Sequence, residues 1–272
     1  MPDRLDISGL RLTVPTEPLT AAAFAPFGDV IENPRPDVQP SQYAQAFGSG
    51  LDSKKTEAHP FNPVSANQGS AIKYQRVSAL ADRYAADRCA SGTPSAPLAS
   101  MFVCSARTLL PENLLTSKND GGGLFHVTIL ERHPYTTQTF VPLATGSSSE
   151  TRYLVIVAPT LPEGSRPPDV RGIKAFIARG DQAVTYGAGT WHAPMAALGA
   201  PGTSIPYFVF QFANGVGPED CQEVLFDCGR GYKVGQTSSV VVRVPPPPTP
   251  PAAPANTTAL AKPNNYGLWS KL

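Results

Sequence analysis

Charge is scarce in this chain, and so are cysteine, histidine and tryptophan. Of the 272 residues only 16% are charged, and 22 Lys and Arg nearly balance 21 Asp and Glu. This balance argues against binding to nucleic acid or to an anionic membrane surface, both of which favour basic proteins. No apolar run approaches the roughly 20 residues that span a bilayer, and no signal-peptide pattern is found. We therefore expect a protein without a membrane span whose partner is a small molecule.

The four cysteines are Cys89, Cys104, Cys221 and Cys228, and no two of them form a C-x-x-C pair. We interpret them as reduced thiols inside a cell. Most of them should be packed as small buried residues, because a free cysteine usually behaves as a small hydrophobic side chain.

Proline and glycine, by contrast, are abundant, with 30 and 23 residues. Between them lie short β-branched and aromatic runs, which predict strands at 101–104, 124–131, 137–141, 153–158, 173–178, 183–186 and 207–213. No helical pattern of a dozen residues separates these runs. An all-β fold, an antiparallel barrel or sandwich, is therefore favoured over alternating strands and helices.

Only two short helices are predicted, one over 19–24 with Thr20 as its N-cap and one over 78–87. The segment 33–70 is rich in Pro, Ser, Gly, Asn and Gln, and it is predicted to form surface loops.

The chain divides into a folded domain at 1–236 and a proline-rich tail at 237–272, which we expect to be extended and mobile. The tail ends in Ser270, Lys271 and Leu272. A C-terminal Ser-Lys-Leu is read by an import receptor as a peroxisomal address. The sequence thus predicts a peroxisomal location, with the cytoplasm as the alternative.

Two polar clusters carry the residues suited to chemistry. In the first, Glu131 and His133 leave one face of a predicted strand, and Gln138 opens the next strand. The second is a glycine-rich turn that leads to Trp191 and His192. Taken alone, the first cluster is equally compatible with an exposed carboxylate and a satisfied histidine, and the second with a turn beside a packed tryptophan.

Together the clusters resemble the two motifs of the cupin superfamily, with altered ligands. Glu131 stands where the first motif has its first His, and Gln138 stands where it has Glu; the second motif keeps His192 and lacks its final Asn. This set is a weaker shell for a transition metal than three His and a carboxylate, so we favour a site without metal or other cofactor.

A more specific resemblance covers residues 19 to 226 in order. The stretches 23–32, 67–74, 130–142, 174–177, 190–194 and 214–221 are similar to the ureidoglycolate lyase family, especially its fungal branch. That resemblance implies a cupin-type antiparallel β-barrel with a few short helices, usually dimeric, that cleaves ureidoglycolate to glyoxylate and urea in allantoin and purine degradation. One departure is Tyr207, where the family commonly has Asp.

The resemblance also assigns the residues of the site. The catalytic set is Glu131, His133, Gln138 and His192, and the substrate-binding set is Asn67, Gln68, Tyr74, Lys174 and Tyr186.

We expect one of the two imidazoles, polarised by Glu131, to remove the hydroxyl proton of the substrate, and the other imidazole or Tyr186 to protonate urea. Lys174 is the candidate for the substrate carboxylate, and Gln138 and Asn67 for its ureido group. Two alternatives stay open: a metal-dependent cupin enzyme, such as a dioxygenase or isomerase, and a non-catalytic binding protein.

Overall fold

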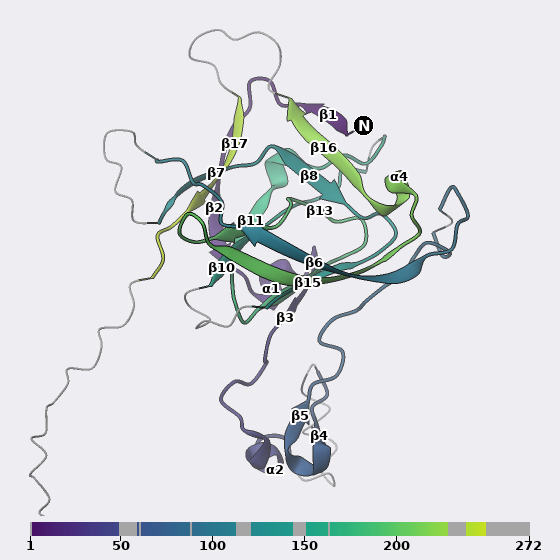
Figure 1. The fold of residues 1–272 in the computed structure, drawn as a ribbon, viewed down its shortest axis with the longest axis vertical. Coiled ribbons are helices and arrows are strands. Elements are labelled where there is room, and N and C mark those ends of the chain that lie inside the picture. Colours follow the sequence, from purple (N-terminus) through teal and green to yellow (C-terminus); the bar gives the residue numbers. More distant parts are fainter. Residues whose placement is uncertain are drawn as a thin grey trace, which may run out of the picture.

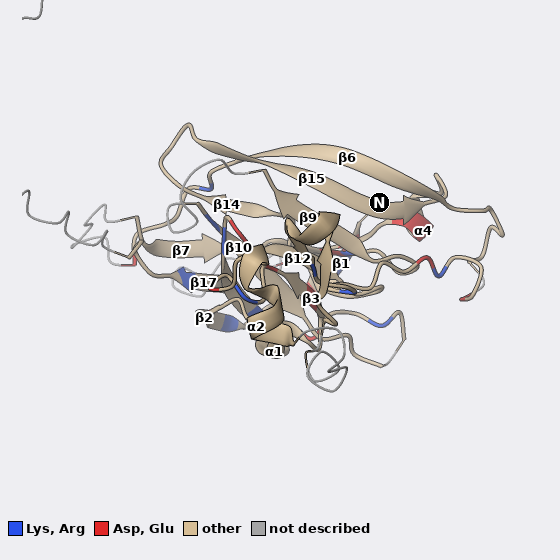
Figure 2. Ribbon diagram, turned by 90° about the horizontal axis from the view of Figure 1, so that it is seen from below, with Lys and Arg blue, Asp and Glu red and all other residues tan. Residues whose placement is uncertain are grey.

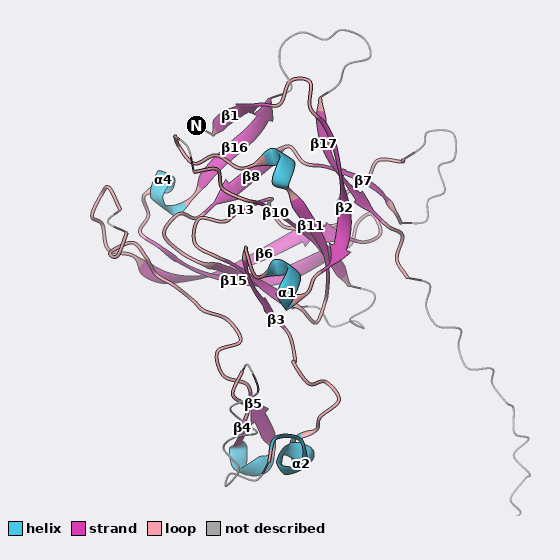
Figure 3. Ribbon diagram, turned by 180° about the vertical axis from the view of Figure 1, so that it is seen from behind, coloured by secondary structure: helices cyan, strands magenta, loops and turns pink. Residues whose placement is uncertain are grey.

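A computed structural model describes residues 2–48, 59, 61–87, 89–112, 121–143, 151–162, 164–227 and 238–248 of the chain. Two curled β-sheets dominate it, and only a few short helices accompany them (Figure 3). The predicted all-β, cupin-like fold is thereby confirmed. No helix among these residues has the length and apolar character to cross a membrane.

The larger sheet contains ten strands. Its order is β1 (Asp3–Asp6), β16 (Gln222–Asp227), β8 (Ile129–Arg132), β13 (Trp191–His192), β10 (Arg152–Ala158), β11 (Lys174–Arg179), β2 (Arg11–Pro18), β17 (Ser239–Val244) and β7 (Gly123–His126), with β14 (Ala196–Leu198) paired to β10. The second sheet has five strands, in the order β3 (Gly28–Ile31), β12 (Ala183–Tyr186), β9 (Gln138–Pro142), β15 (Ser204–Ala213) and β6 (Ala96–Ser105).

Strand β10 shows why these residues form two layers of core. Its side chains are apolar on both faces, which is the pattern of a fully covered strand. Tyr153, Val155 and Val157 face the cluster enclosed by the two sheets, and Leu154 and Ile156 pack into the cluster on the opposite face. The inner apolar cluster packs beside the polar residues of the barrel.

The helices of the described residues are all short. They are α1 (Ala21–Phe24), α2 (Tyr43–Phe47) and α4 (Gly217–Asp220), with 3₁₀ turns η1 (Pro40–Gln42), η2 (Asn67–Gly69) and η3 (Val170–Gly172). The Thr20 hydroxyl accepts a hydrogen bond from the Ala23 amide at 3.2 Å, which confirms the predicted N-cap of α1.

The second predicted helix, over 78–87, is wrong. Asp82 forms an isolated bridge with Thr136, and the Arg83 amide donates to the Tyr135 carbonyl at 2.8 Å. A single turn follows. Backbone pairing with a distant segment has thus overridden the local helical spacing of this stretch.

Residues 33–48, 59 and 61–77, here called the arm, project from the barrel (Figure 1). The arm was predicted as loops, and it contains η1, α2, η2 and a hairpin of β4 (Val64–Ala66) and β5 (Ala71–Lys73). An aromatic cluster holds it together, in which Phe47 lies 5.4 Å from Tyr43, 5.6 Å from His59 and 6.2 Å from Tyr74 between ring centroids.

The predicted boundary of the C-terminal tail also needs correction. Strand β17 lies between β2 and β7, and Val240 and Val242 are fully buried. The folded part therefore extends to at least Val244, because three alternating valines supply the apolar face that closes the large sheet. Residues 249–272, including Ser270, Lys271 and Leu272, lie outside the described residues.

Candidate active site

The polar side chains predicted for catalysis come together between the two sheets. His192 on β13 pairs in register with Glu131 on β8, and Gln138 on β9 pairs with Tyr186 on β12. The rings of His133 and His192 lie 5.5 Å apart. Alternation along β8, β9 and β13 turns Glu131, Gln138 and His192 to this side, and His133 follows directly after β8.

His192 is enclosed on three sides. Its ring stacks on Tyr186 with centroids 4.0 Å apart, and its Nδ1 lies 2.9 Å from the Thr190 carbonyl oxygen. Because a carbonyl only accepts, Nδ1 carries the proton. Its Nε2 then faces two oxygens, Oε1 of Gln138 at 3.2 Å and Oε1 of Glu131 at 3.5 Å.

His133 also donates from Nδ1 to a main-chain carbonyl, that of a different residue. Its Nδ1 lies 2.6 Å from the main-chain oxygen of Asp220, so this nitrogen is again the donor. Its Nε2 is buried and has no hydrogen-bond partner among the described residues. Burial, helped by the charge of His192, lowers the pKa of His133 to about 4, so the imidazole is neutral near pH 7.

The pKa values of Glu131 and Tyr186 are shifted in opposite directions. Burial alone would raise the pKa of Glu131, but the hydrogen bond and charge of His192 outweigh it and the pKa falls below its usual value. Burial raises the pKa of Tyr186 well above its usual value, which keeps the phenol protonated. The Tyr186 hydroxyl has no partner in the described part of the chain, so it is available as a donor.

A surrounding set of hydrogen bonds, which sequence reasoning missed, fixes these groups. Gln211 on β15 accepts from Gln138 Nε2 at 2.7 Å. The Asp220 carboxylate accepts from the Tyr84 hydroxyl at 2.6 Å and from the Asn214 amide at 2.8 Å, which immobilises the residue whose carbonyl orients His133. The stretch 214–221 was part of the family resemblance, and that was the one signal for this role.

The predicted substrate-binding residues of the arm lie elsewhere. Asn67 and Gln68 are in η2 and Tyr74 follows β5, so the structure does not bring them to His133 and His192 of the same chain (Figure 1). Lys174 is also engaged away from them, since its Nζ pairs with Glu17 at 3.3 Å and its side chain is 55% exposed. Their binding roles stay predictions.

Tyr207, at the position where the family commonly has Asp, is fully buried in the inner apolar cluster. Its ring packs edge-on against Tyr153 at 5.5 Å and Phe140 at 5.9 Å. Burial raises its pKa, and the hydroxyl has no partner among the described residues. Tyr207 therefore fills space beside the site as a neutral group.

Three side chains at the site could serve as ligands for a divalent cation. One ligand atom each from Glu131, His133 and His192 lies within 4.8 Å of the other two. Two imidazoles and a carboxylate are common ligands of transition metals. Glu131, Cys221 and Glu223 meet the same limit, but burial raises the pKa of Cys221 to about 12, which disfavours the thiolate that binds metal.

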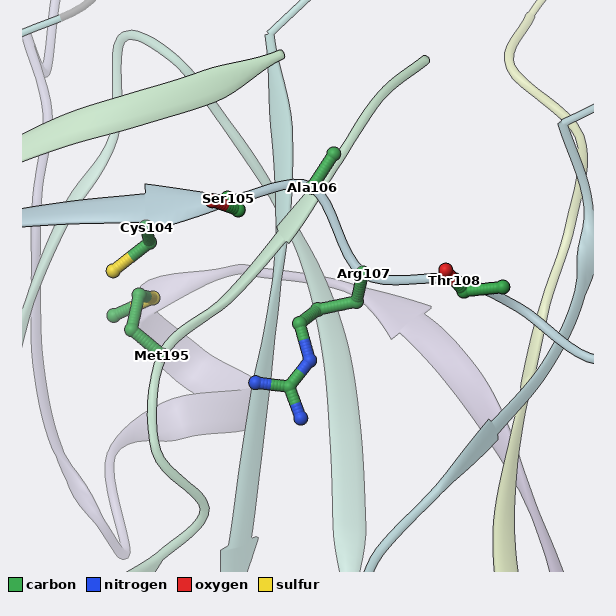
Figure 4. Close-up of a pocket in the computed structure, with 6 residues that line it drawn as sticks. All are labelled: Cys104, Ser105, Ala106, Arg107, Thr108 and Met195. Atoms are coloured by element: carbon green, nitrogen blue, oxygen red, sulfur yellow. The ribbon is translucent and has the colours of Figure 1, made fainter. Parts of the chain in front are cut away.

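A hollow of about 460 Å³ is separate from this cluster. It is lined by Cys104, Ser105, Ala106, Arg107, Thr108 and Met195 (Figure 4). Its lining includes neither a histidine nor a carboxylate, and burial raises the pKa of Cys104, so no acid–base pair operates there.

Cys89, Cys104 and Cys221 carry free thiols, whereas Cys228 lies outside the described residues.

An all-β barrel whose inner face presents two differently bonded imidazoles, a carboxylate and an amide defines a class, the cupin-like proteins that act on small molecules. Comparison with known proteins narrows this class. The family described as ureidoglycolate lyase matches residues 11–233, so the chain belongs to the ureidoglycolate lyase family.

Individual relatives agree with this assignment. The chain is 37% identical to a ureidoglycolate lyase of Schizosaccharomyces pombe over 204 residues, which cover 75% of this chain and 86% of the relative. It is 35% identical to a ureidoglycolate lyase of Saccharomyces cerevisiae over 189 residues, or 69% of this chain and 80% of the relative. A Burkholderia mallei ureidoglycolate lyase is 33% identical over 187 residues, with 69% and 76% covered. The predicted resemblance, including its fungal branch, is confirmed.

Proposed function

We propose that this protein is a ureidoglycolate lyase, which cleaves ureidoglycolate to glyoxylate and urea in the degradation of allantoin and purines. Family membership supports the substrate. The observation that carries the chemistry is the contrast between His133 and His192, whose rings are 5.5 Å apart and whose Nε2 atoms have opposite surroundings.

His133 is the base in this proposal. Ureidoglycolate carries a hydroxyl, a carboxylate and a urea nitrogen on one carbon, and elimination begins with loss of the hydroxyl proton. The Nε2 lone pair of His133 is unpartnered, and the lowered pKa keeps it unprotonated. After it takes the proton, the oxygen forms the carbonyl of glyoxylate and the C–N bond breaks.

His192 is the acid that completes the reaction. The electron pair of the broken bond stays on the urea nitrogen, which needs a proton. Oxygens of Gln138 and Glu131 lie 3.2 and 3.5 Å from Nε2 of His192, and such acceptors favour an N–H group on this atom, which would donate its proton to urea. Tyr186 remains protonated and serves as a donor to the substrate rather than as the acid.

The alternative to be weighed against this mechanism is a site that binds a divalent cation. Glu131, His133 and His192 would hold it, and it would supply Lewis-acid polarisation of a substrate oxygen. The proposal of a site without metal is distinguished from this alternative by one experiment.

The experiment is to incubate metal-stripped protein with racemic ureidoglycolate and to follow glyoxylate, urea and ammonia together. Equimolar glyoxylate and urea from the stripped protein supports the lyase without metal. The same products only after a cation is restored supports the metal-dependent form. Ammonia in place of urea, or no product with and without metal, contradicts the proposed reaction.

We further propose a homodimer in which the arm of one chain reaches the site of the other. Strands β6 and β15 offer a long surface for such contact, since neither contains a charged residue and Met101, Val103 and Phe208 are exposed by 58%, 67% and 40% (Figure 2). Edge strands normally carry charge that prevents pairing. Asn67 and Gln68 are exposed on a projecting arm, with positive φ angles of 48° and 54°.

Mixing two inactive variants tests this arrangement. His133→Ala lacks the base, and a double Asn67→Ala, Gln68→Ala variant lacks the arm amides. Co-refolded mixtures should recover up to about a quarter of wild-type activity, because mixed dimers contain one intact site. If co-refolded wild-type protein is active and the mixture of variants shows no recovery, the arm acts on the site of its own chain. A monomer in solution would exclude the dimer.

A peroxisomal location is also proposed, on the strength of Ser270-Lys271-Leu272 alone. The test compares a fluorescent fusion that ends in the native tripeptide with one that ends in Ser-Lys-Leu-Gly. Punctate signal from the first and diffuse signal from the second would support it. Diffuse signal from both would assign the protein to the cytoplasm.

A further inference from the structure

A second polar cavity lies next to the loops that carry the two histidines. Its volume is about 800 Å³, and Pro134, Gly189 and Thr190 belong to its lining. None of Glu131, His133, Gln138 and His192 lines it. The cavity is thus separated from the proposed site by the backbone of these loops.

Its charge is predominantly positive. Arg83, Arg132, Arg166 and Asp87 line the cavity. Arg83 and Asp87 neutralise each other through an ion pair of 2.7 Å. This leaves the guanidinium groups of Arg132 and Arg166 in one cavity without a carboxylate paired to either among the described residues.

Arg132 is fixed in place rather than free to move into solvent. Its guanidinium lies 4.5 Å from the centre of the Trp191 ring. It donates to Gln222 Oε1 at 2.8 Å and to the carbonyl oxygens of Arg166 at 2.8 Å and Ser165 at 2.9 Å. Three such bonds leave two of its five N–H groups for another acceptor.

Arg166 is anchored through its backbone. Its carbonyl accepts from both Arg132 Nη1 and Trp191 Nε1, the latter at 3.1 Å. These two bonds hold a residue whose φ of 57° is unfavourable for a side chain other than glycine. Its exposed side chain is left to reach into the cavity beside Arg132.

We propose that this cavity binds a small oxyanion of the carboxylate or phosphate class between Arg132 and Arg166. An anion there relieves the repulsion of two like charges and pairs with the planar donors that suit such groups. Burial and the nearby charge of Arg166 both lower the pKa of Arg132, which agrees with an uncompensated pair.

The bound anion would contact the loop that positions both imidazoles. The Thr190 carbonyl fixes Nδ1 of His192, and the Gly189 amide donates to the His133 carbonyl at 2.8 Å. An anion bound in the cavity would therefore change the position of the loop that holds His133 and His192.

Tryptophan fluorescence tests the proposal without any need for turnover. The chain has two tryptophans, and Trp269→Phe leaves Trp191, whose ring packs against Arg132, as the reporter. Inorganic phosphate and oxalate are titrated separately at ionic strength held constant with sodium chloride. A saturable change in Trp191 emission is expected for at least one of them.

Two variants in this background decide the outcome. Arg166→Ala should weaken binding at least about tenfold, and Arg171→Ala, at an exposed arginine of η3 outside the cavity, should leave it unchanged. Circular dichroism checks that both are folded. A change that does not saturate, or equal affinity in both variants, would overturn the proposal.

The same pair of variants separates two sources of the anion. If the KM for ureidoglycolate rises in Arg166→Ala alone, the cavity receives the carboxylate of the substrate. If KM is unchanged while phosphate or oxalate binding is lost, the anion is a separate ligand.

Discussion

His133 and His192 have similar partners at Nδ1 and different surroundings at Nε2. In both, Nδ1 donates to a main-chain carbonyl, of Asp220 in one case and of Thr190 in the other. The Nε2 of His133 has no hydrogen-bond partner among the described residues, whereas that of His192 faces Gln138 and Glu131. In the proposed mechanism this difference makes His133 the base and His192 the acid.

Removing the unpartnered imidazole should have the largest effect. We expect His133→Ala to lower kcat about a thousandfold, because the substrate hydroxyl loses its base. The matched control is His126→Ala on β7, an exposed histidine that should keep full activity. Steady-state kinetics measure both, with circular dichroism to verify folding. Full activity in His133→Ala would refute the assignment.

The buried neutral state of His133 should also appear in the pH dependence of stability. Its pKa in the folded protein, about 4, lies below the usual 6.5, so the unfolded chain binds the proton more tightly. Stability from this residue is complete above about pH 6.5 and falls as the pH drops toward 4, by on the order of 3 kcal/mol.

Urea denaturation between pH 7 and 4 measures this loss. The comparison is with His133→Gln, which has no proton to gain and should show a shallower decline than the wild type. Parallel curves for the two proteins would show that His133 is accessible to protons in the folded state.

Glu131→Gln should test the role of His192, because it changes the surroundings of Nε2 of that residue and leaves His133 intact. It removes the carboxylate that faces His192 Nε2 at 3.5 Å and leaves His133 its lone pair. We expect kcat to fall about 10- to 100-fold with little change in KM, because proton delivery to urea is weakened. Glu223→Gln on β16, opposite Glu131 in the ladder, is the control. An equal loss in both variants would point to net charge instead.

The smallest effect is expected from Tyr84→Phe. This change removes the 2.6 Å hydrogen bond to Asp220, whose carbonyl orients His133. A bond to a charged acceptor is worth about 1.5 to 3 kcal/mol, so the melting temperature and kcat should both fall modestly. Tyr43→Phe, which removes a bond to Pro63 in the arm, should spare kcat. A Tyr84→Phe enzyme with unchanged kcat would mean that the Asp220 carbonyl is fixed by other contacts.

The difference between the histidines also marks the limit of sequence reasoning. Alternation along a strand fixes which side chains share a face, but it left open whether the face of Glu131 and Gln138 turns inward or toward solvent. The partners of the two histidines come from distant parts of the chain: Gln138, at Nε2 of His192, is 54 positions away, and Asp220, at Nδ1 of His133, is 87 positions away. Spacing within one segment contains no information about such contacts.

The same reason explains the errors in secondary structure. Strands with long apolar runs, such as β10, were predicted well. Strands β1 and β16 are short and carry charge, and β17 stands beside a proline run, so their local patterns resembled loops or a tail. What makes them strands is the neighbouring backbone, and the wrongly predicted helix at 78–87 is lost to the same kind of long-range pairing.

Strand β17 has a consequence for the order of folding. Val240 of this strand pairs with Leu12 of β2, so residues near opposite ends of the sequence are neighbours in the large sheet. A ribosome must release almost the whole chain before these two strands can meet, and loop closure over such a separation is entropically slow. Until then β2 and β7 keep open edges, and the newly made protein is at its most vulnerable to aggregation.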